Sequence, residues 1–278
     1  MNKVFFGDCR DTMRDLIAQG VKVQMCVTSP PYFGLRDYGH PGQLGLEETP
    51  ADYVAAMVQV FALVREMLAD DGVLWLNLGD TYGDGKQLLG IPWRVALALQ
   101  SDGWTLRQDI IWHKPNPMPE SVKDRCTKAH EYIFLLSKND RYLFDSEAIA
   151  EPSKYGPGCG WDSARQGTYS DEQRKSHDYR EPQQSFRTIK ETRNRRSVWE
   201  VPTMPYTGAH FATFPPALIE PCILAGSRPG DTVLDCFFGS GTTGEVAGNL
   251  GRNWIGCEIN EGYAPLQRAR TAQSGLAL

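Results

Sequence analysis

The sequence has no apolar run that approaches the ~20 residues of a membrane-spanning helix, and no signal peptide opens it. Its seven cysteines include no Cys-x-x-Cys pair and no Cys/His spacing typical of zinc, and their odd number does not suggest a disulfide framework. We therefore expect reduced thiols. Together these absences predict a soluble, cytoplasmic protein with no membrane partner and no bound metal.

An excess of basic charge is also missing. The chain contains 29 Lys and Arg against 34 Asp and Glu, which gives a net charge of −5. A globally acidic protein does not bind nucleic acid indiscriminately, so any contact with DNA has to come from a local basic patch. With 278 residues, the chain can bury a sizeable core as one large α/β domain or as a domain with an insertion.

One turn carries a distinctive set of acceptors. The apolar run from Val23 to Val27 predicts a buried strand, and Thr28 and the acceptor turn (Ser29-Pro30-Pro31-Tyr32) follow it. Each proline fixes φ and removes an N–H, so the turn is rigid and its carbonyls can accept hydrogen bonds. A hydroxyl, a carbonyl and a flat ring could hold the amino group of a planar heterocycle. An ordinary Pro-Pro turn is the alternative reading of these residues alone.

A second motif lies near the other end of the chain. Residues 232–244 predict a strand, a glycine turn and the start of a helix. The spacing of Gly239, Gly241 and Gly244 matches the dinucleotide fingerprint, and Glu258 follows at about the 20-residue spacing of a ribose-binding acid. A nicotinamide oxidoreductase is therefore a rival interpretation. It needs a second βαβ half after the loop, whereas this chain places its other strands at the N-terminus.

Together the two motifs resemble the amino-methyltransferases of DNA, which methylate exocyclic nitrogens with S-adenosylmethionine. Ser29 to Tyr32 matches the family's Ser/Asp/Asn-Pro-Pro-Tyr/Phe motif, and Phe237 to Gly241 matches its Phe-x-Gly-x-Gly loop. Their order is that of the β class, and Cys236 departs from the proline that is common there. The resemblance implies a doubly wound, mostly parallel α/β sheet, circularly permuted, with an antiparallel hairpin.

The resemblance also implies a division of the chain. We expect a catalytic part over residues 1–150, a target-recognition insert over 151–200, and a cofactor-binding part over 201–278. Within the insert, residues 187–196 place five basic residues against one acid, which predicts contacts with DNA phosphates unless the run is only a solvated surface. The proline-rich stretch 114–119 resembles the loop beside the target-base pocket, although a structural crossover explains it equally well. The predicted DNA contacts are Lys114, Asn116, Arg187, Lys190, Arg193, Arg195 and Arg196.

The same resemblance assigns site residues. Ser29, Pro30, Pro31 and Tyr32 would hold the target amine. Residues 201–218 would cover the methionine end of the cofactor, although an isolated histidine such as His210 is more often an ordinary loop residue. The implied cofactor-binding residues are Asp8, Thr28, His210, Phe211, Phe214, Asp235, Phe237, Gly239, Ser240, Gly241, Thr242 and Glu258.

The implied activity is site-specific methylation of the exocyclic N4 of cytosine in duplex DNA, with the base flipped out of the helix. In the family, Ser-Pro-Pro-Tyr accompanies N4-cytosine more often than N6-adenine, and serine is a weaker acceptor than the aspartate of many adenine enzymes. An N6-adenine enzyme is the alternative, and an inactive methyltransferase fold that binds nucleic acid is the non-enzyme alternative. The sequence leaves open a homodimer and a cognate restriction endonuclease.

Overall fold

The structure is a computed structural model that describes residues 2–153, 191–203 and 214–272. It divides into two compact units, one of Met1–Asp145 with Arg196–Leu278 and one of Ser146–Arg195. The described part of the second unit contains a short antiparallel ladder between β6 (Glu151–Pro152) and β7 (Thr192–Arg193). All the elements below belong to the first unit.

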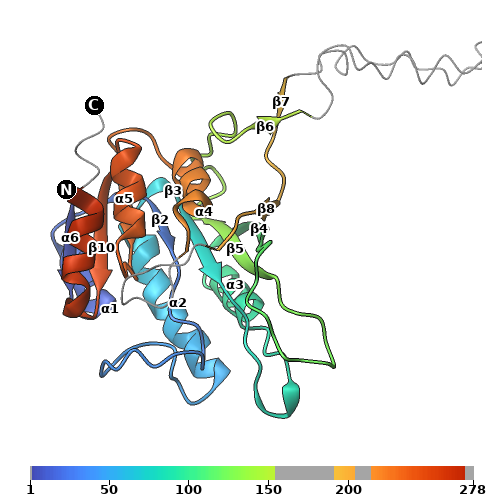
Figure 1. Cartoon of the computed structure of the whole chain (residues 1–278). Helices are drawn as coiled ribbons and strands as arrows, with labels where there is room; N and C mark the ends of the chain where they lie inside the picture. The colour runs from blue at the N-terminus through green and yellow to red at the C-terminus, as the bar shows by residue number, and fades with distance from the viewer. Residues whose placement is uncertain (1, 154–190, 204–213, 273–278) are drawn as a thin grey trace, which may run out of the picture. The chain divides into compact units, whose positions relative to one another are not determined.

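An eight-stranded sheet forms the centre of the first unit, in the order β1-β10-β9-β2-β3-β5-β4-β8 (Figure 1). β5 runs antiparallel to its neighbours β3 and β4, and the other neighbouring pairs are parallel. The late strands β9 and β10 lie between β1 and β2, which is the permuted order that the sequence predicted. The strands are β1 (Lys3–Phe6), β2 (Val23–Thr28), β3 (Leu68–Leu78), β4 (Thr105–His113), β5 (His130–Ser137), β8 (Val198–Glu200), β9 (Thr232–Asp235) and β10 (Asn253–Glu258).

Helices cover both faces of this sheet, so the mostly parallel, doubly wound fold is confirmed. Along the strands, Cys26 and Leu74 join the core formed with α1 (Cys9–Ala18), α2 (Pro50–Met67) and α3 (Ile91–Ser101). The alternate residues Val73 and Trp75 face Gly226 of α4 (Pro216–Gly226), which packs beside α5 (Thr242–Asn249), itself followed by α6 (Ala264–Ala272). Burial on both faces explains why these strands are continuous apolar runs.

Two element boundaries do not follow from the local sequence pattern. β3 begins at Leu68, ahead of the apolar run that starts at Val73, because Leu68 already pairs with Val23 and the register shifts only afterwards. Gly72 permits this path, since a Cβ there would lie 2.9 Å from the Ala69 carbonyl and 3.0 Å from the Gln24 carbonyl. The expected insert ended at residue 200, yet residues 198–200 form β8 and pair with β4 in the main sheet. The second unit ends at Arg195.

Candidate active site

The two sequence motifs meet at one edge of the sheet. β2, β9 and β10 are parallel, so the acceptor turn, the glycine loop (Cys236–Gly241) and Glu258 lie at the carboxyl ends of their strands. β5 runs antiparallel to β3, and its first residues, His130 and Glu131, therefore reach the same edge. Ligands in open α/β sheets bind at this edge, so the two motifs lie where a ligand site is expected.

Asp235 at the end of β9 braces the glycine loop. Its Oδ1 accepts hydrogen bonds from the Thr28 hydroxyl at 2.6 Å and the Phe237 N–H at 3.0 Å, and its Oδ2 accepts one from the Thr243 hydroxyl at 2.6 Å. Burial raises the pKa of this carboxyl, and the two hydroxyls and the N–H oppose the rise. A carboxylate with both oxygens engaged in this way holds the loop and the start of α5 in one conformation.

The loop itself depends on glycine geometry. Gly239 has φ +52° and Gly241 has φ +90°, both in the left-handed region that residues with a Cβ seldom adopt. Gly241 is the N-cap of α5, and a Cβ on it would lie 3.3 Å from the Gln267 backbone. The loop backbone is also held from outside, since the Gln267 amide donates to the Gly239 carbonyl at 2.7 Å.

Glu258 closes the other side of the loop. Its Oε2 accepts from the Gly239 N–H at 2.7 Å, and its Oε1 accepts from the Asn260 N–H at 2.9 Å. Burial raises the pKa of this carboxyl, while the backbone N–H groups lower it. The side chain thus stands at a strand end beside the glycine loop, where a carboxylate can accept hydrogen bonds from the hydroxyls of a ribose.

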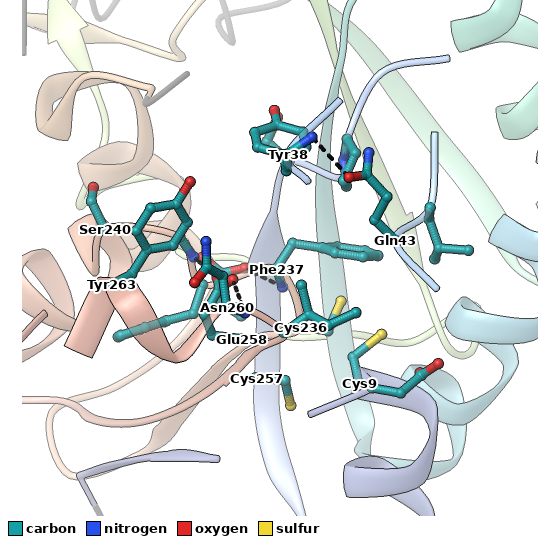
Figure 2. A pocket seen from close by; sticks show the side chains of 18 of the residues that line it. Cys9, Tyr38, Gln43, Cys236, Phe237, Ser240, Cys257, Glu258, Asn260 and Tyr263 are labelled. Carbon is teal, nitrogen blue, oxygen red and sulfur yellow. Dashed lines mark hydrogen bonds between the residues drawn. The ribbon is translucent and has the colours of Figure 1, made fainter. Parts of the chain in front are cut away.

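A pocket opens at this edge between the glycine loop, the end of β10 and the loop that follows the acceptor turn (Figure 2). Many of the sequence-predicted residues line it. They are Asp8, Ser29, Pro31, Phe214, Asp235, Phe237, Gly239, Ser240, Thr242 and Glu258. Thr28 lies buried behind the lining and acts through Asp235, and Gly241 shapes the loop without lining the pocket. His210 and Phe211 lie outside the described residues.

The Asp8 carboxylate also serves the chain itself. It caps α1 by accepting from the Arg10 N–H at 2.8 Å, and it forms an ion pair with the Arg10 guanidinium at 2.5 Å. This side-chain hydrogen bond to Arg10 lowers the pKa of Asp8. Asp8 therefore lines the pocket as a carboxylate that is already bonded to Arg10. This bonding limits its capacity to accept a further hydrogen bond from a ligand.

Sequence reasoning missed several lining residues. Tyr38 and Gln43 come from the loop after the acceptor turn, where the Gln43 amide oxygen accepts from the Tyr38 N–H at 2.8 Å. Asn260 and Tyr263 also line the pocket and lie in the segment that follows β10. Their position just after a predicted strand could have identified them from the sequence. Three thiols, Cys9, Cys236 and Cys257, also line the pocket, and burial raises the pKa of each well above its ordinary value.

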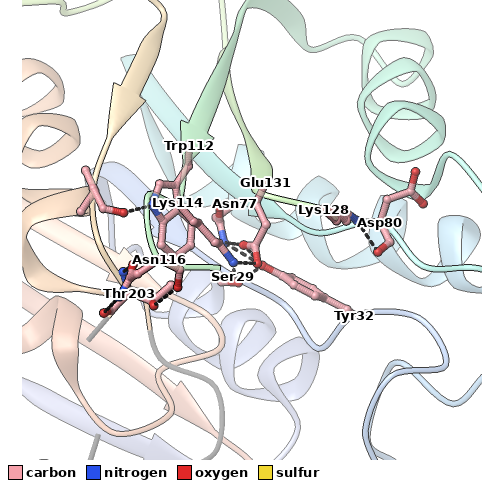
Figure 3. A network of polar contacts seen from close by, with 11 residues as sticks. Ser29, Tyr32, Asn77, Asp80, Trp112, Lys114, Asn116, Lys128, Glu131 and Thr203 are labelled. Atoms are coloured by element: carbon pink, nitrogen blue, oxygen red, sulfur yellow. Dashed lines mark hydrogen bonds and ion pairs between the residues drawn. The ribbon is translucent and has the colours of Figure 1, made fainter. Parts of the chain in front are cut away.

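The acceptor turn lies in a polar network (Figure 3). The Tyr32 hydroxyl donates to Glu131 at 2.6 Å, and the Asn77 amide donates to the Tyr32 oxygen at 2.7 Å. The Tyr32 ring packs on Gly79, where a Cβ would lie 2.5 Å from the ring. The Pro31 carbonyl accepts from the Tyr53 hydroxyl at 2.9 Å, and Pro30 is buried. The turn is therefore held rigidly on several sides, as the two prolines predicted.

Both predicted DNA contacts in the 114–119 stretch make internal bonds. Lys114 forms an ion pair with Glu131, and its ammonium lies 4.3 Å from the centre of the Trp112 ring. The Asn116 amide donates to the Thr203 carbonyl at 3.0 Å and accepts from the Thr203 N–H at 2.9 Å. These bonds position the stretch next to the acceptor turn and support a structural role for both side chains.

The basic run is described only in part. Arg193 lies in β7 and forms an ion pair with Glu151 at 2.9 Å. Arg195 and Arg196 lie at the boundary between the two units. Arg187 and Lys190 fall outside the described residues. Within the described ranges there is no group of three or more His, Cys, Asp and Glu side chains able to hold a metal ion, and no helix long and apolar enough to cross a membrane.

The family model for DNA methylases matches residues 23–268. The chain belongs to this family of DNA methylases. The Type II methyltransferase M.SmaI of Serratia marcescens is 44% identical to it, over 96% of this chain and 90% of that protein. The DNA methylase is thus related to a Type II enzyme along nearly its whole length.

Solved structures agree with the fold of the methylase. The PvuII DNA methyltransferase (cytosine-N4-specific) matches with a TM-score of 0.69 and 20% identity, covering 97% of this chain and 86% of that one. TTHA0409 of Thermus thermophilus, complexed with S-adenosyl-L-methionine, matches with a TM-score of 0.64 and 25% identity, covering 100% of this chain and 98% of that one. The methylase acts on DNA and uses S-adenosylmethionine as its methyl donor.

Proposed function

We propose that this methyltransferase transfers a methyl group to the exocyclic N4 of cytosine in duplex DNA. The observation that carries the proposal is the position of Ser29, which lines the cofactor pocket and opens the rigid acceptor turn. In a duplex the amine is stacked and paired, so the target base has to rotate out of the helix to reach a strand-end pocket.

The cofactor site has the chemistry that S-adenosylmethionine needs. The strand-end carboxylate of Glu258 would accept from the ribose hydroxyls, and the glycine loop would let the backbone approach the ligand closely. Tyr38, Asn260 and Tyr263 would enclose the flat, apolar parts of the ligand. When bound, the cofactor supplies an electrophilic methyl group on a sulfonium.

The acceptor turn would prepare the nucleophile. An amine on cytosine is a poor nucleophile because its lone pair is delocalised into the ring. Acceptors aimed at its two protons favour a more tetrahedral nitrogen, whose lone pair could attack the methyl carbon in line. The N–C bond would form as the bond between that carbon and the sulfonium sulfur breaks, and the nitrogen would then release one of its protons. The Ser29 hydroxyl and the Pro30 carbonyl would be these acceptors. In the structure the Tyr32 hydroxyl is anchored and its ring packs on Gly79, so any stacking on the base uses the remaining ring surface.

Serine supports cytosine over adenine because the neutral hydroxyl is a weaker acceptor than the aspartate found in many adenine enzymes of the family. The PvuII enzyme is cytosine-N4-specific, but at 20% identity its likeness speaks for the fold alone. N6-adenine is the competing target. Incubating unmodified DNA with the enzyme, digesting it to nucleosides and weighing them by mass spectrometry distinguishes the two. We expect N4-methylcytosine, and N6-methyladenine as the product would overturn the proposal.

A further inference from the structure

The Glu131 carboxylate accepts hydrogen bonds from three side chains that lie far apart in the sequence (Figure 3). Its Oε2 accepts from the Tyr32 hydroxyl at 2.6 Å and from the Asn77 amide of β3 at 3.0 Å. Its Oε1 accepts from the ammonium of Lys114, which follows β4. The Glu131 side chain is only 14% exposed, so this is a largely buried carboxylate compensated by a cation and two further donors.

These bonds determine the direction of the Tyr32 proton. Burial, followed by the charge of Glu131, raises the pKa of Tyr32 well above its ordinary value, so the phenol stays protonated. A carboxylate can only accept, and the single phenol proton therefore points to Glu131. The Tyr32 oxygen is left as an acceptor, and the Asn77 amide donates to it at 2.7 Å.

The consequence reaches Ser29. Its hydroxyl lies 3.4 Å from the Tyr32 oxygen, which can take the serine proton only because the phenol proton points elsewhere. The Asn77 Nδ2 also lies 3.3 Å from Ser29 Oγ, but its two N–H groups serve the closer Tyr32 oxygen and Glu131, so toward Ser29 it is only a shared, weak donor. A serine hydroxyl has one proton and two lone pairs. With the proton directed at Tyr32 and one lone pair facing Asn77, the other lone pair is available to accept from an amine in the pocket.

We propose that Glu131 is a positioning residue for methyl transfer, which orients the Tyr32 hydroxyl and thereby makes Ser29 an acceptor. The inference rests on the proposed function in one respect, namely that the target amine lies beside Ser29. Lys114 completes the arrangement, because its ammonium balances the charge of the largely buried carboxylate and, through Glu131, ties the stretch after β4 to the acceptor turn.

The decisive variant is Glu131→Gln. The amide keeps the shape but can donate to the Tyr32 oxygen, which reverses the direction of the chain of hydrogen bonds. We expect kcat for methyl incorporation into unmodified plasmid DNA to fall about tenfold to a hundredfold, with the affinity for S-adenosylmethionine unchanged within about twofold. Glu200→Gln is the matched control, because Glu200 lies on β8 with its side chain 70% exposed. It should retain wild-type kcat.

A double-mutant cycle separates positioning from general support of the fold. If Glu131 acts through Ser29, adding Glu131→Gln to Ser29→Ala should lower kcat by less than about twofold further. Losses that multiply, or a Glu131→Gln enzyme with wild-type kcat, would overturn the role. Should Glu131→Gln fail to fold, Tyr32→Phe interrupts the same series of hydrogen bonds and leaves the ion pair between Glu131 and Lys114 in place. It should show the same loss and the same lack of additivity, and wild-type kcat in that variant would equally overturn the proposal.

The proposed target base and the proposed positioning role of Glu131 can be tested separately. Mass spectrometry of the wild-type product tests the base alone, so methyladenine together with a non-additive cycle would remove the cytosine proposal and keep Glu131. Wild-type kcat in Ser29→Ala would show that the amine does not lie beside Ser29, which overturns the positioning role directly.

Discussion

The hydroxyl of Thr28, at the end of β2, donates a 2.6 Å hydrogen bond to Oδ1 of Asp235, at the end of β9. The two residues are 207 positions apart in the chain and are 0% and 1% exposed. Thr28 directly precedes the acceptor turn, and Asp235 directly precedes the glycine loop. This buried bond therefore ties the strand that carries the acceptor turn to the strand that carries the glycine loop.

Breaking that bond should loosen the glycine loop. Thr28→Val keeps the shape of the side chain but removes one of the donors to a buried carboxylate. We expect a loss of about 1–3 kcal/mol of folding stability and a weaker affinity for S-adenosylmethionine. Thermal melting and calorimetry measure the two effects. Thr127→Val, at an exposed threonine, is the control, and a Thr28→Val protein that matches the control in both measurements would contradict the bracing role of the bond.

Glu258 should make cofactor binding depend on pH. Burial raises its pKa from the ordinary 4.5, so the folded apo protein holds this proton more tightly than the unfolded chain does. The stability that this protonated carboxyl contributes is present below pH 4.5 and is lost as the pH rises through the raised pKa. Ribose hydroxyls that donate to the carboxylate would lower its pKa again, so binding would release a proton.

We therefore expect affinity for S-adenosylmethionine to increase as the pH rises from about 4.5 through the raised pKa of Glu258. Calorimetry across this range measures the slope, and buffers of different ionisation enthalpy report the released proton. Glu258→Gln should bind more weakly and lose most of the slope. A slope that persists unchanged in Glu258→Gln would assign the proton to another group.

The strands and the cofactor loop were largely predictable from sequence, because they depend on local patterns. Apolar runs such as Val23–Val27 end at residues that break strands, and the loop of Gly239 and Gly241 has a fixed spacing. The boundary at Leu68 was not predictable in this way. The sequence Asp70-Asp71-Gly72 suggests an end, yet pairing of Leu68 with Val23 extends β3 backwards, and such pairing is decided by the neighbouring strand.

The residues that surround the acceptor turn were harder to foresee. Glu131 and Asn77 lie inside ordinary strand patterns, 99 and 45 positions from Tyr32 in the chain, and only the sheet order brings them to its hydroxyl. Lys114 was predicted as a DNA contact because its stretch resembles the loop beside the target-base pocket, and that contact stays a prediction. The antiparallel pairing of β4 and β5, which places this lysine against Glu131, could not be foreseen from local sequence.

The glycine loop offers a direct test of the cofactor site. Gly239→Val places a β-branched side chain at φ +52°, beside the pocket that the loop lines. We expect the affinity for S-adenosylmethionine to fall about tenfold or more, since the backbone can no longer approach the ligand. Gly20→Val is matched in backbone strain, with φ +73° and open space around it at the end of α1. It should lose stability without losing affinity, and equal cofactor affinities in the two variants would remove Gly239 from the site.

The basic run 187–196 predicts how the enzyme's affinity for DNA depends on salt. If Arg195 and Arg196 contact phosphates, the double variant Arg195→Gln, Arg196→Gln should weaken DNA binding, because fewer counterions are released. Each lost contact should reduce the slope of log affinity against log salt by about 0.9. Fluorescence anisotropy with a labelled duplex between about 50 and 200 mM salt measures this slope.

The control removes the same charge from elsewhere on the protein. Lys22 precedes β2, at the end of the strand opposite to the acceptor turn, and Arg268 lies exposed on α6. The variant Lys22→Gln, Arg268→Gln changes the net charge equally and should leave the slope nearly unchanged. Cofactor affinity should be that of the wild type in both variants. If the two slopes fall together, the effect comes from net charge alone, and if neither falls, residues 195–196 belong to a solvated surface and the DNA contacts have to be sought elsewhere.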